Sequence, residues 1–150
     1  MSIDLGLIFS RFLHYTAALT LCGVSLFPLY AGRFETPHPT EAHILLGTTL
    51  IALLSCVAWL LFVTASMTGT LEGTFDLDSL RAVAFGTSFG LLWCARLCLL
   101  TVIFLVIACA PDVSTAKTPA LALLATLALV MLAGTGHAGI KHLASEEKFR

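Results

Sequence analysis

The sequence predicts an all-α integral membrane protein: a bundle of four membrane-spanning helices with a short interfacial helix between the second and the third. The first observation is composition, since 58% of the residues are hydrophobic and only 11% are charged. Soluble domains are about 45–50% apolar and about 25% charged. The second is a set of four long apolar runs. Each run is long enough, once one arginine is tolerated, for the ~20 residues that cross a ~30 Å hydrocarbon core.

The four spans are expected at approximately 5–31, 43–69, 86–110 and 118–142, in a single transmembrane domain that covers residues 1–150. Helices are expected because a backbone in lipid must satisfy its own hydrogen bonds. Pro37 and Pro39 mark the loop after the first span, and Pro111 marks the loop after the third. Asp76, three residues before Ser79, is typical of a helix cap and predicts the short interfacial helix.

Several classes of protein are disfavoured. A net charge of −1 without a basic patch argues against nucleic-acid binding. The five cysteines all lie in apolar stretches and are odd in number, which argues against a disulfide framework. Cys94 and Cys98 share a helix face as a feasible soft-metal pair, but we interpret them as packing residues. The first apolar run is too long for a signal-peptide core and is interpreted as a span.

The ionisable residues within the spans are the main functional signal, because such residues are costly in lipid. They are Arg11, His14, Arg96 and His137. In a four-span topology, the start of the first helix, the end of the second, the start of the third and the end of the fourth face one side. These residues and Met67 therefore fall in one half of the bilayer, and we expect His14, Met67 and His137 to share a cavity.

Two imidazoles and a thioether form a donor set that suits copper, and no carboxylate for a harder cation lies in the spans. Each residue also has a structural interpretation. A membrane histidine often hydrogen-bonds a neighbouring helix, Met67 can serve packing alone, and Arg11 can extend to the headgroups. Arg96 lies deeper, and we expect it to pair with Asp76, Asp78 or Glu72, or with an anionic cofactor group.

Four segments, in order along the chain, resemble the copper resistance D (CopD) family of membrane proteins. They open the first span, close the second, enter the third and close the fourth. The segments are RFLHYTA at 11–17, TASMTG at 64–69, FGTSFG at 85–90 with WCARL at 93–97, and TGHA at 135–138. Members of the family are commonly longer, and this chain resembles their first half.

The resemblance implies a role in moving copper across the bacterial inner membrane, beside a periplasmic copper carrier. It implies copper ligands and a supporting shell around them. The ligands are His14, Met67 and His137, and the shell is Arg11, Trp93 and Arg96.

The sequence therefore predicts a multi-pass inner-membrane protein that binds copper and takes part in copper transport or resistance, without being an enzyme. Its expected partners are the lipid bilayer, a periplasmic copper carrier and further membrane helices or subunits. Copper would leave through polar positions such as Thr20, Cys22, Ser25, Thr48 or Ser55. Two alternatives stay open: an electron-transfer protein with haem b between His14 and His137, and a structural subunit of a larger membrane complex.

Overall fold

The computed structural model describes residues 2–32, 39–109 and 117–147, and beyond Ala133 it describes the course of the helix but not the side chains. Every regular element in these ranges is helical, which confirms the all-α prediction. The elements are α1 (Ser2–Tyr30), α2 (Pro39–Thr68), the 3₁₀ helix η1 (Glu72–Phe75), α3 (Leu77–Gly86), α4 (Ser88–Cys109) and α5 (Lys117–Glu147).

Three helical segments in the described ranges are long and apolar enough to cross a membrane: Ile3–Tyr30, Thr40–Thr68 and Phe89–Cys109. A shorter apolar segment, Thr118–Ala133, lies in α5. Many large apolar side chains face outwards, among them Leu5, Phe12, Leu54, Leu91 and Leu123. Lipid solvates such side chains, so their exposure fits a membrane protein. A fourth crossing, and an interfacial position for α3, stay predictions.

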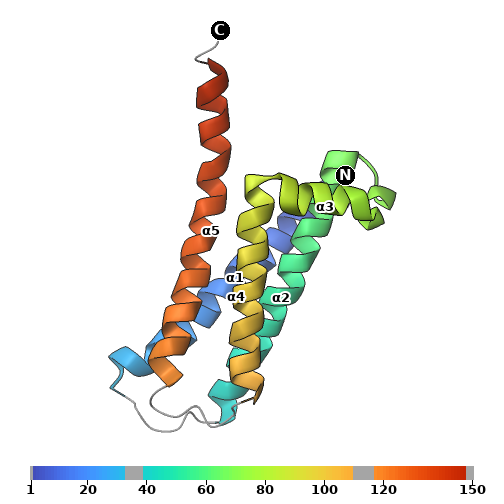
Figure 1. The fold of residues 1–150 in the computed structure, drawn as a ribbon. Coiled ribbons are helices and arrows are strands. Elements are labelled where there is room, and N and C mark those ends of the chain that lie inside the picture. Colours follow the sequence, from blue (N-terminus) through green and yellow to red (C-terminus); the bar gives the residue numbers. More distant parts are fainter. Residues whose placement is uncertain (1, 33–38, 110–116, 148–150) are drawn as a thin grey trace.

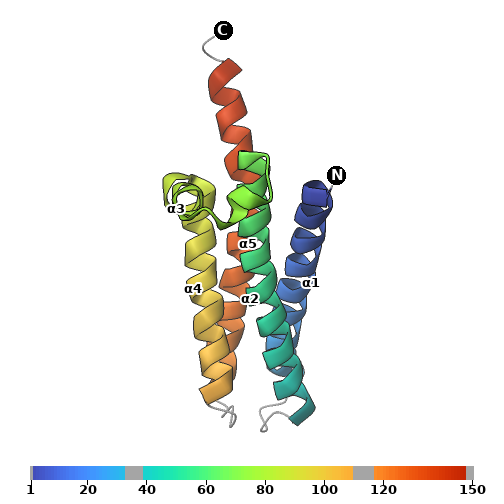
Figure 2. The same ribbon diagram turned by 90° about the vertical axis from the view of Figure 1, so that its right-hand side faces the viewer.

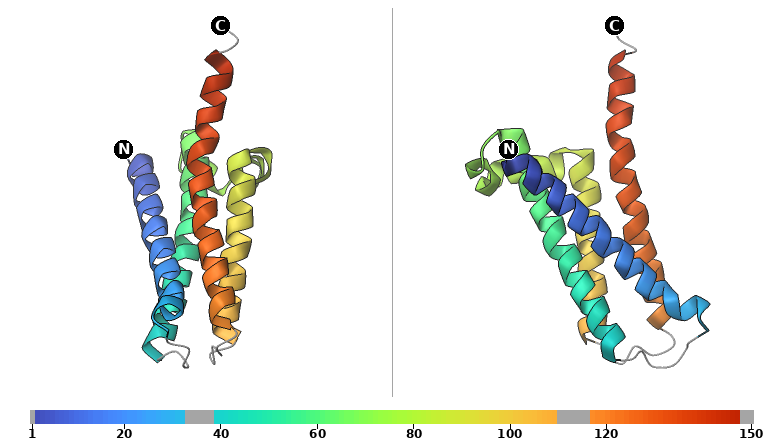
Figure 3. Two further views of the ribbon diagram at one scale, coloured as in Figure 1. Left: turned by 90° about the vertical axis from the view of Figure 1, so that its left-hand side faces the viewer. Right: turned by 180° about the vertical axis from the view of Figure 1, so that it is seen from behind.

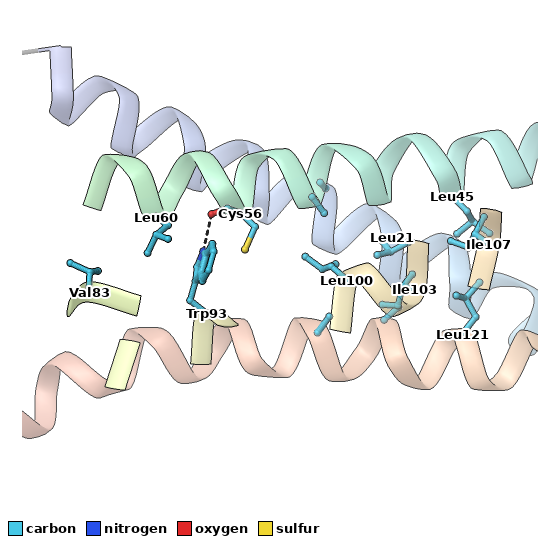
Figure 4. Close-up of a cluster of buried hydrophobic side chains, with 14 residues drawn as sticks. Leu21, Leu45, Cys56, Leu60, Val83, Trp93, Leu100, Ile103, Ile107 and Leu121 are labelled. Carbon is cyan, nitrogen blue, oxygen red and sulfur yellow. Dashed lines mark hydrogen bonds between the residues drawn. The ribbon is translucent and has the colours of Figure 1, made fainter. Parts of the chain in front are cut away.

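The four long helices pack in a closed ring, in which α1 contacts α2 and α5, and α4 also contacts α2 and α5 (Figures 1 and 2). Leucines and isoleucines such as Leu21, Leu100 and Ile103 fill its centre (Figure 4). Ala52 and Ala125 are fully or almost fully buried in the same core. Small residues of this kind let membrane helices approach closely, which is how such helices gain packing energy.

The helices differ in direction and extent. In Figure 3, α1 runs obliquely to α5, and the C-terminal part of α5 extends beyond the ends of the other long helices. α3 instead lies across one end of the ring, between the end of α2 and the start of α4 (Figure 1). The end of the ring that carries α3 is therefore also the end at which α1 begins and α5 finishes.

Local sequence sets the helix ends. α2 begins at Pro39, earlier than expected, because a proline in the first helical position needs no hydrogen-bond partner for its nitrogen. It ends where Gly69 adopts a positive φ of 76° and donates its N–H to the Ala65 carbonyl. The predicted cap of α3 is confirmed: the Asp76 carboxylate accepts hydrogen bonds from Ser79 N at 3.0 Å and Ser79 Oγ at 2.6 Å.

The corner between α3 and α4 is tight. Thr87 alone separates the two helices, and its Oγ1 accepts a hydrogen bond from Gly90 N at 2.9 Å. A Cβ atom at Gly90 would collide with the carbonyl oxygens of Val83 and Ala84. Because these are backbone atoms of α3, they have little freedom to move aside. Glycine at this position therefore fixes the angle between α3 and α4.

Gly90→Ala is expected to destabilise the protein by about 1–3 kcal/mol, as overpacking does in a well-packed core. Gly86→Ala is the matched control, since a Cβ atom there would meet nothing within 4 Å, and its effect should stay within about 0.5 kcal/mol. Thermal unfolding of both variants in detergent measures the difference. Equal stability of the two variants would show that the corner tolerates a methyl group.

Asp76→Ala is expected to loosen α3, because it removes the cap that Ser79 engages. The same hydrogen bonds hold the pKa of the Asp76 carboxyl below its usual value. The cap therefore stabilises α3 above the usual aspartate pKa of about 4 and is lost as the pH falls through the lower folded value. Amide hydrogen exchange in α3 checks both effects, with Asp78→Ala as the control. Unchanged exchange in Asp76→Ala would contradict the capping role.

Candidate functional site

The Trp59 indole lies at the centre of a cluster of aromatic and cationic side chains. It is buried in the C-terminal half of α2, with 3% of its surface exposed. The rings of His14 and Tyr15 from α1 lie 5.8 and 5.9 Å from it, between ring centroids. The Phe89 ring from α4 lies 5.6 Å away. One side chain of α2 therefore joins α1 to α4.

Two arginines contact the same indole. The guanidinium carbon of Arg11 lies 5.3 Å from the ring centroid, and that of Arg96 lies 5.9 Å from it. Both distances fall within the range of cation–π attraction. Arg11 is exposed, whereas Arg96 is only 1% exposed. The cluster thus combines an outer and an inner cation around one aromatic ring.

His14 is fully buried and oriented by α2. Its Nδ1 lies 3.1 Å from the Ala52 carbonyl oxygen and 3.1 Å from Ser55 Oγ. A carbonyl oxygen only accepts hydrogen bonds, so Nδ1 carries the proton and donates it. In the neutral ring, Nε2 therefore keeps its lone pair. Nε2 is buried and has no hydrogen-bond partner in the part of the chain that the structure describes.

The environment of Arg96 differs from the expected one. Its Nη2 donates to the Met131 carbonyl of α5, while Nε and Nη1 are buried without a partner among the described residues. The expected ion pair with Asp76 is wrong, because that carboxylate caps α3 through Ser79. Asp78 and Glu72 likewise form no ion pair with Arg96 in the described ranges. The polar contact that Arg96 does make among the described residues is with the backbone of α5.

Trp93 ties α4 to α2. Its Nε1 donates to the Cys56 carbonyl oxygen at 2.8 Å, and Figure 4 shows the indole beside the Cys56 sulfur. Trp93 lies three residues before Arg96 on α4. The structure thus brings His14, Trp93, Arg11 and Arg96 into one region, although the role of the last three as a shell around copper stays a prediction.

Of the other two expected ligands, Met67 is not brought to His14, and the side chain of His137 is not described. The Met67 side chain is 64% exposed and lies twelve residues beyond Ser55 on α2, roughly 18 Å along the helix. His137 belongs to α5, six residues after Met131, and its side chain lies outside the described residues. Within the described residues, no three His, Cys, Asp or Glu side chains gather as a metal site. Ligand roles for Met67 and His137 stay predictions.

The polar positions expected along an exit route are mostly used within their own helices. Thr20 is exposed and donates to the Thr16 carbonyl, and Thr48 donates to the Ile44 carbonyl. Ser55 is buried and contacts His14, whereas Ser25 is buried with no partner for its hydroxyl among the described residues. Threonine hydroxyls that bond the preceding turn offer little to a passing ion.

Sequence reasoning missed Trp59. A signal was available, because tryptophan in membrane proteins usually lies at the bilayer interface, and Trp59 falls in the middle of an apolar run. A tryptophan so placed indicates a polar or cationic neighbour within the bundle. What the sequence lacks is the register of α1 on α2, which places residues 52–59 opposite His14.

Trp93→Phe is expected to destabilise the protein by about 1 kcal/mol more than Trp59→Phe. The first change removes a hydrogen bond that is made, whereas Trp59 Nε1 has no partner in the described ranges. Phenylalanine at position 59 also keeps an aromatic face for both arginines. Chemical or thermal unfolding in detergent compares the two variants. A larger loss for Trp59→Phe would place the main stabilising role on the Trp59 ring.

Comparison with known proteins gives one family. Residues 2–142 match the family model described as "Copper resistance protein D-like, N-terminal domain". No curated protein and no solved structure gives a significant match. The match covers nearly the whole chain, and it confirms the resemblance that the four sequence segments carry. This membrane protein belongs to the copper resistance protein D-like N-terminal domain family.

Proposed function

We propose that this protein binds copper within its helix bundle and takes part in copper transport or resistance across the bacterial inner membrane. Family membership supports a copper-related role. The observation that carries the proposal is the state of His14: one ring nitrogen donates to a carbonyl, and the other is buried with a free lone pair. Histidines that bind metals characteristically donate their second ring nitrogen in this way.

The roles that we propose for His14, His137 and Met67 are based on where each residue lies along its helix. His14 Nε2 is the anchor, and His137 of α5 is the proposed second ligand. Met67 is at the exposed end of α2, at the end of the ring that carries α3. We place it at the entrance, where its thioether would favour Cu(I) over harder cations and pass the ion inwards.

The ion is cargo in this proposal, and no chemical turnover is needed. Arg11 and Arg96 carry positive charge close to the proposed ligand, so they would disfavour a doubly charged Cu(II) ion there more than a singly charged Cu(I) ion. The bilayer is the solvent for the outer face of the bundle. A periplasmic copper carrier is the proposed donor or acceptor, and further membrane helices or subunits are the proposed source of any missing ligand.

A Cu(I) competition titration in detergent tests the site. His14→Ala and His137→Ala should each abolish stoichiometric binding, because a soft site with few ligands depends on each of them. Met67→Leu conserves volume and removes the sulfur donor. It should weaken Cu(I) binding, and weaken it more than Cu(II) binding.

The matched controls are His43→Ala and the Cys94→Ser, Cys98→Ser double variant. His43 is exposed near the start of α2, at the other end of that helix from Met67. Both controls should bind copper like the parent. Loss of binding in the cysteine variant, with the His14 variant unaffected, would move the site elsewhere. A visible spectrum of the purified protein with a Soret band that shifts on reduction would instead identify a haem b protein.

A further inference from the structure

A buried guanidinium without a carboxylate is the most unusual polar feature of the described chain. Arg96 is 1% exposed and donates one hydrogen bond, to the Met131 carbonyl. Its Nε and Nη1 have no partner among the described residues. A carbonyl oxygen does not neutralise a charge, and a buried charge that lacks a counterion is costly. The site therefore favours an added negative charge.

A second unpaired donor lies in the same cluster. Trp59 Nε1 is buried and has no partner in the described ranges, and the Arg96 guanidinium carbon lies 5.9 Å from the Trp59 ring centroid. The indole N–H only donates hydrogen bonds, as does the guanidinium. Arg11 adds a second positive charge 5.3 Å from the same ring. Three donor nitrogens without a partner among the described residues, two of Arg96 and one of Trp59, thus lie in one cluster with the second cation, Arg11.

We propose that Arg96 and Trp59 form a binding site for a small monovalent anion. The Nε and Nη1 of Arg96 and the Nε1 of Trp59 donate to the anion, and Arg11 attracts it from the exposed side. One buried cation requires one negative charge, which favours a monovalent anion. The rings of His14 and Phe89 pack on the same indole, so the surroundings of Trp59 are crowded, and the proposed ligand is a small ion such as a halide. His14 Nε2, as an acceptor, is left to a metal.

Tryptophan fluorescence with iodide as the probe tests the proposal in the metal-free protein. The chain has two tryptophans, Trp59 and Trp93, and both are buried in or beside the cluster. Iodide that binds the site should quench them with a saturable dependence on concentration, at constant ionic strength set by gluconate. Chloride should reverse the quenching competitively. Random collisions would give a linear dependence that chloride leaves unchanged.

Arg96→Gln should lose the saturable component, whereas Arg81→Gln, at an exposed arginine of α3, should keep it. If Arg96→Gln fails to fold, Trp59→Phe replaces it as the test variant, and the fluorescence of Trp93 then reports the iodide quenching. The loss of one donor should weaken the iodide affinity about fivefold. Linear quenching of equal slope in the parent and these variants would overturn the proposal. Because no copper is present, the outcome is independent of the proposed metal site.

Discussion

The contact of the Trp59 indole of α2 with side chains from two other helices is the interaction on which the arrangement of the site depends. His14, Tyr15 and Arg11 reach it from α1, and Arg96 reaches it from α4. The bilayer offers no strong hydrophobic force to press helices together, so packing and polar contacts must do so. A flat aromatic side chain suits this purpose, because it attracts cations through its face and packs against rings at the same time.

Among the described residues, the same cluster holds most of the buried side-chain polar atoms that have no hydrogen-bond partner. Elsewhere many of the described threonine hydroxyls bond the carbonyl one turn earlier, as Thr16, Thr49 and Thr64 do. The hydroxyl hydrogens of these threonines are used within their own helices, so they are not available to a neighbouring helix or a ligand. His14 Nε2, Trp59 Nε1 and two nitrogens of Arg96 are different, since they keep unused hydrogen-bonding capacity in one place. Unpaired polar atoms cost stability, so their concentration in one place is typical of a functional site.

Sequence reasoning predicted the helical elements of the fold, and it singled out four of the residues that the structure brings into one region, His14, Arg11, Trp93 and Arg96. Apolar runs, prolines and the Asp76 cap predicted the helices, because each of these signals acts within a few residues. That His14 and Arg96 lie at the same level of the bundle followed from topology alone. The register between helices did not, since it depends on which small residues meet. That register places His14 against Ala52 of α2, at a distance from Met67 near the end of the same helix. It also places Trp59 among the rings and cations of the cluster, which could not be predicted from the sequence.

The unequal lengths of the helices connect this cluster to the surrounding lipid. α4 has 22 residues and α2 has 30, or about 33 and 45 Å at 1.5 Å per residue. The length of α4 matches a ~30 Å hydrocarbon core, whereas a longer helix that crosses the same core must tilt or extend into the headgroups. α1, which carries His14 and Arg11, already runs obliquely to α5 (Figure 3). A thinner bilayer would increase this tilt through hydrophobic mismatch, so membrane thickness would act directly on the angle between α1 and the Trp59 ring.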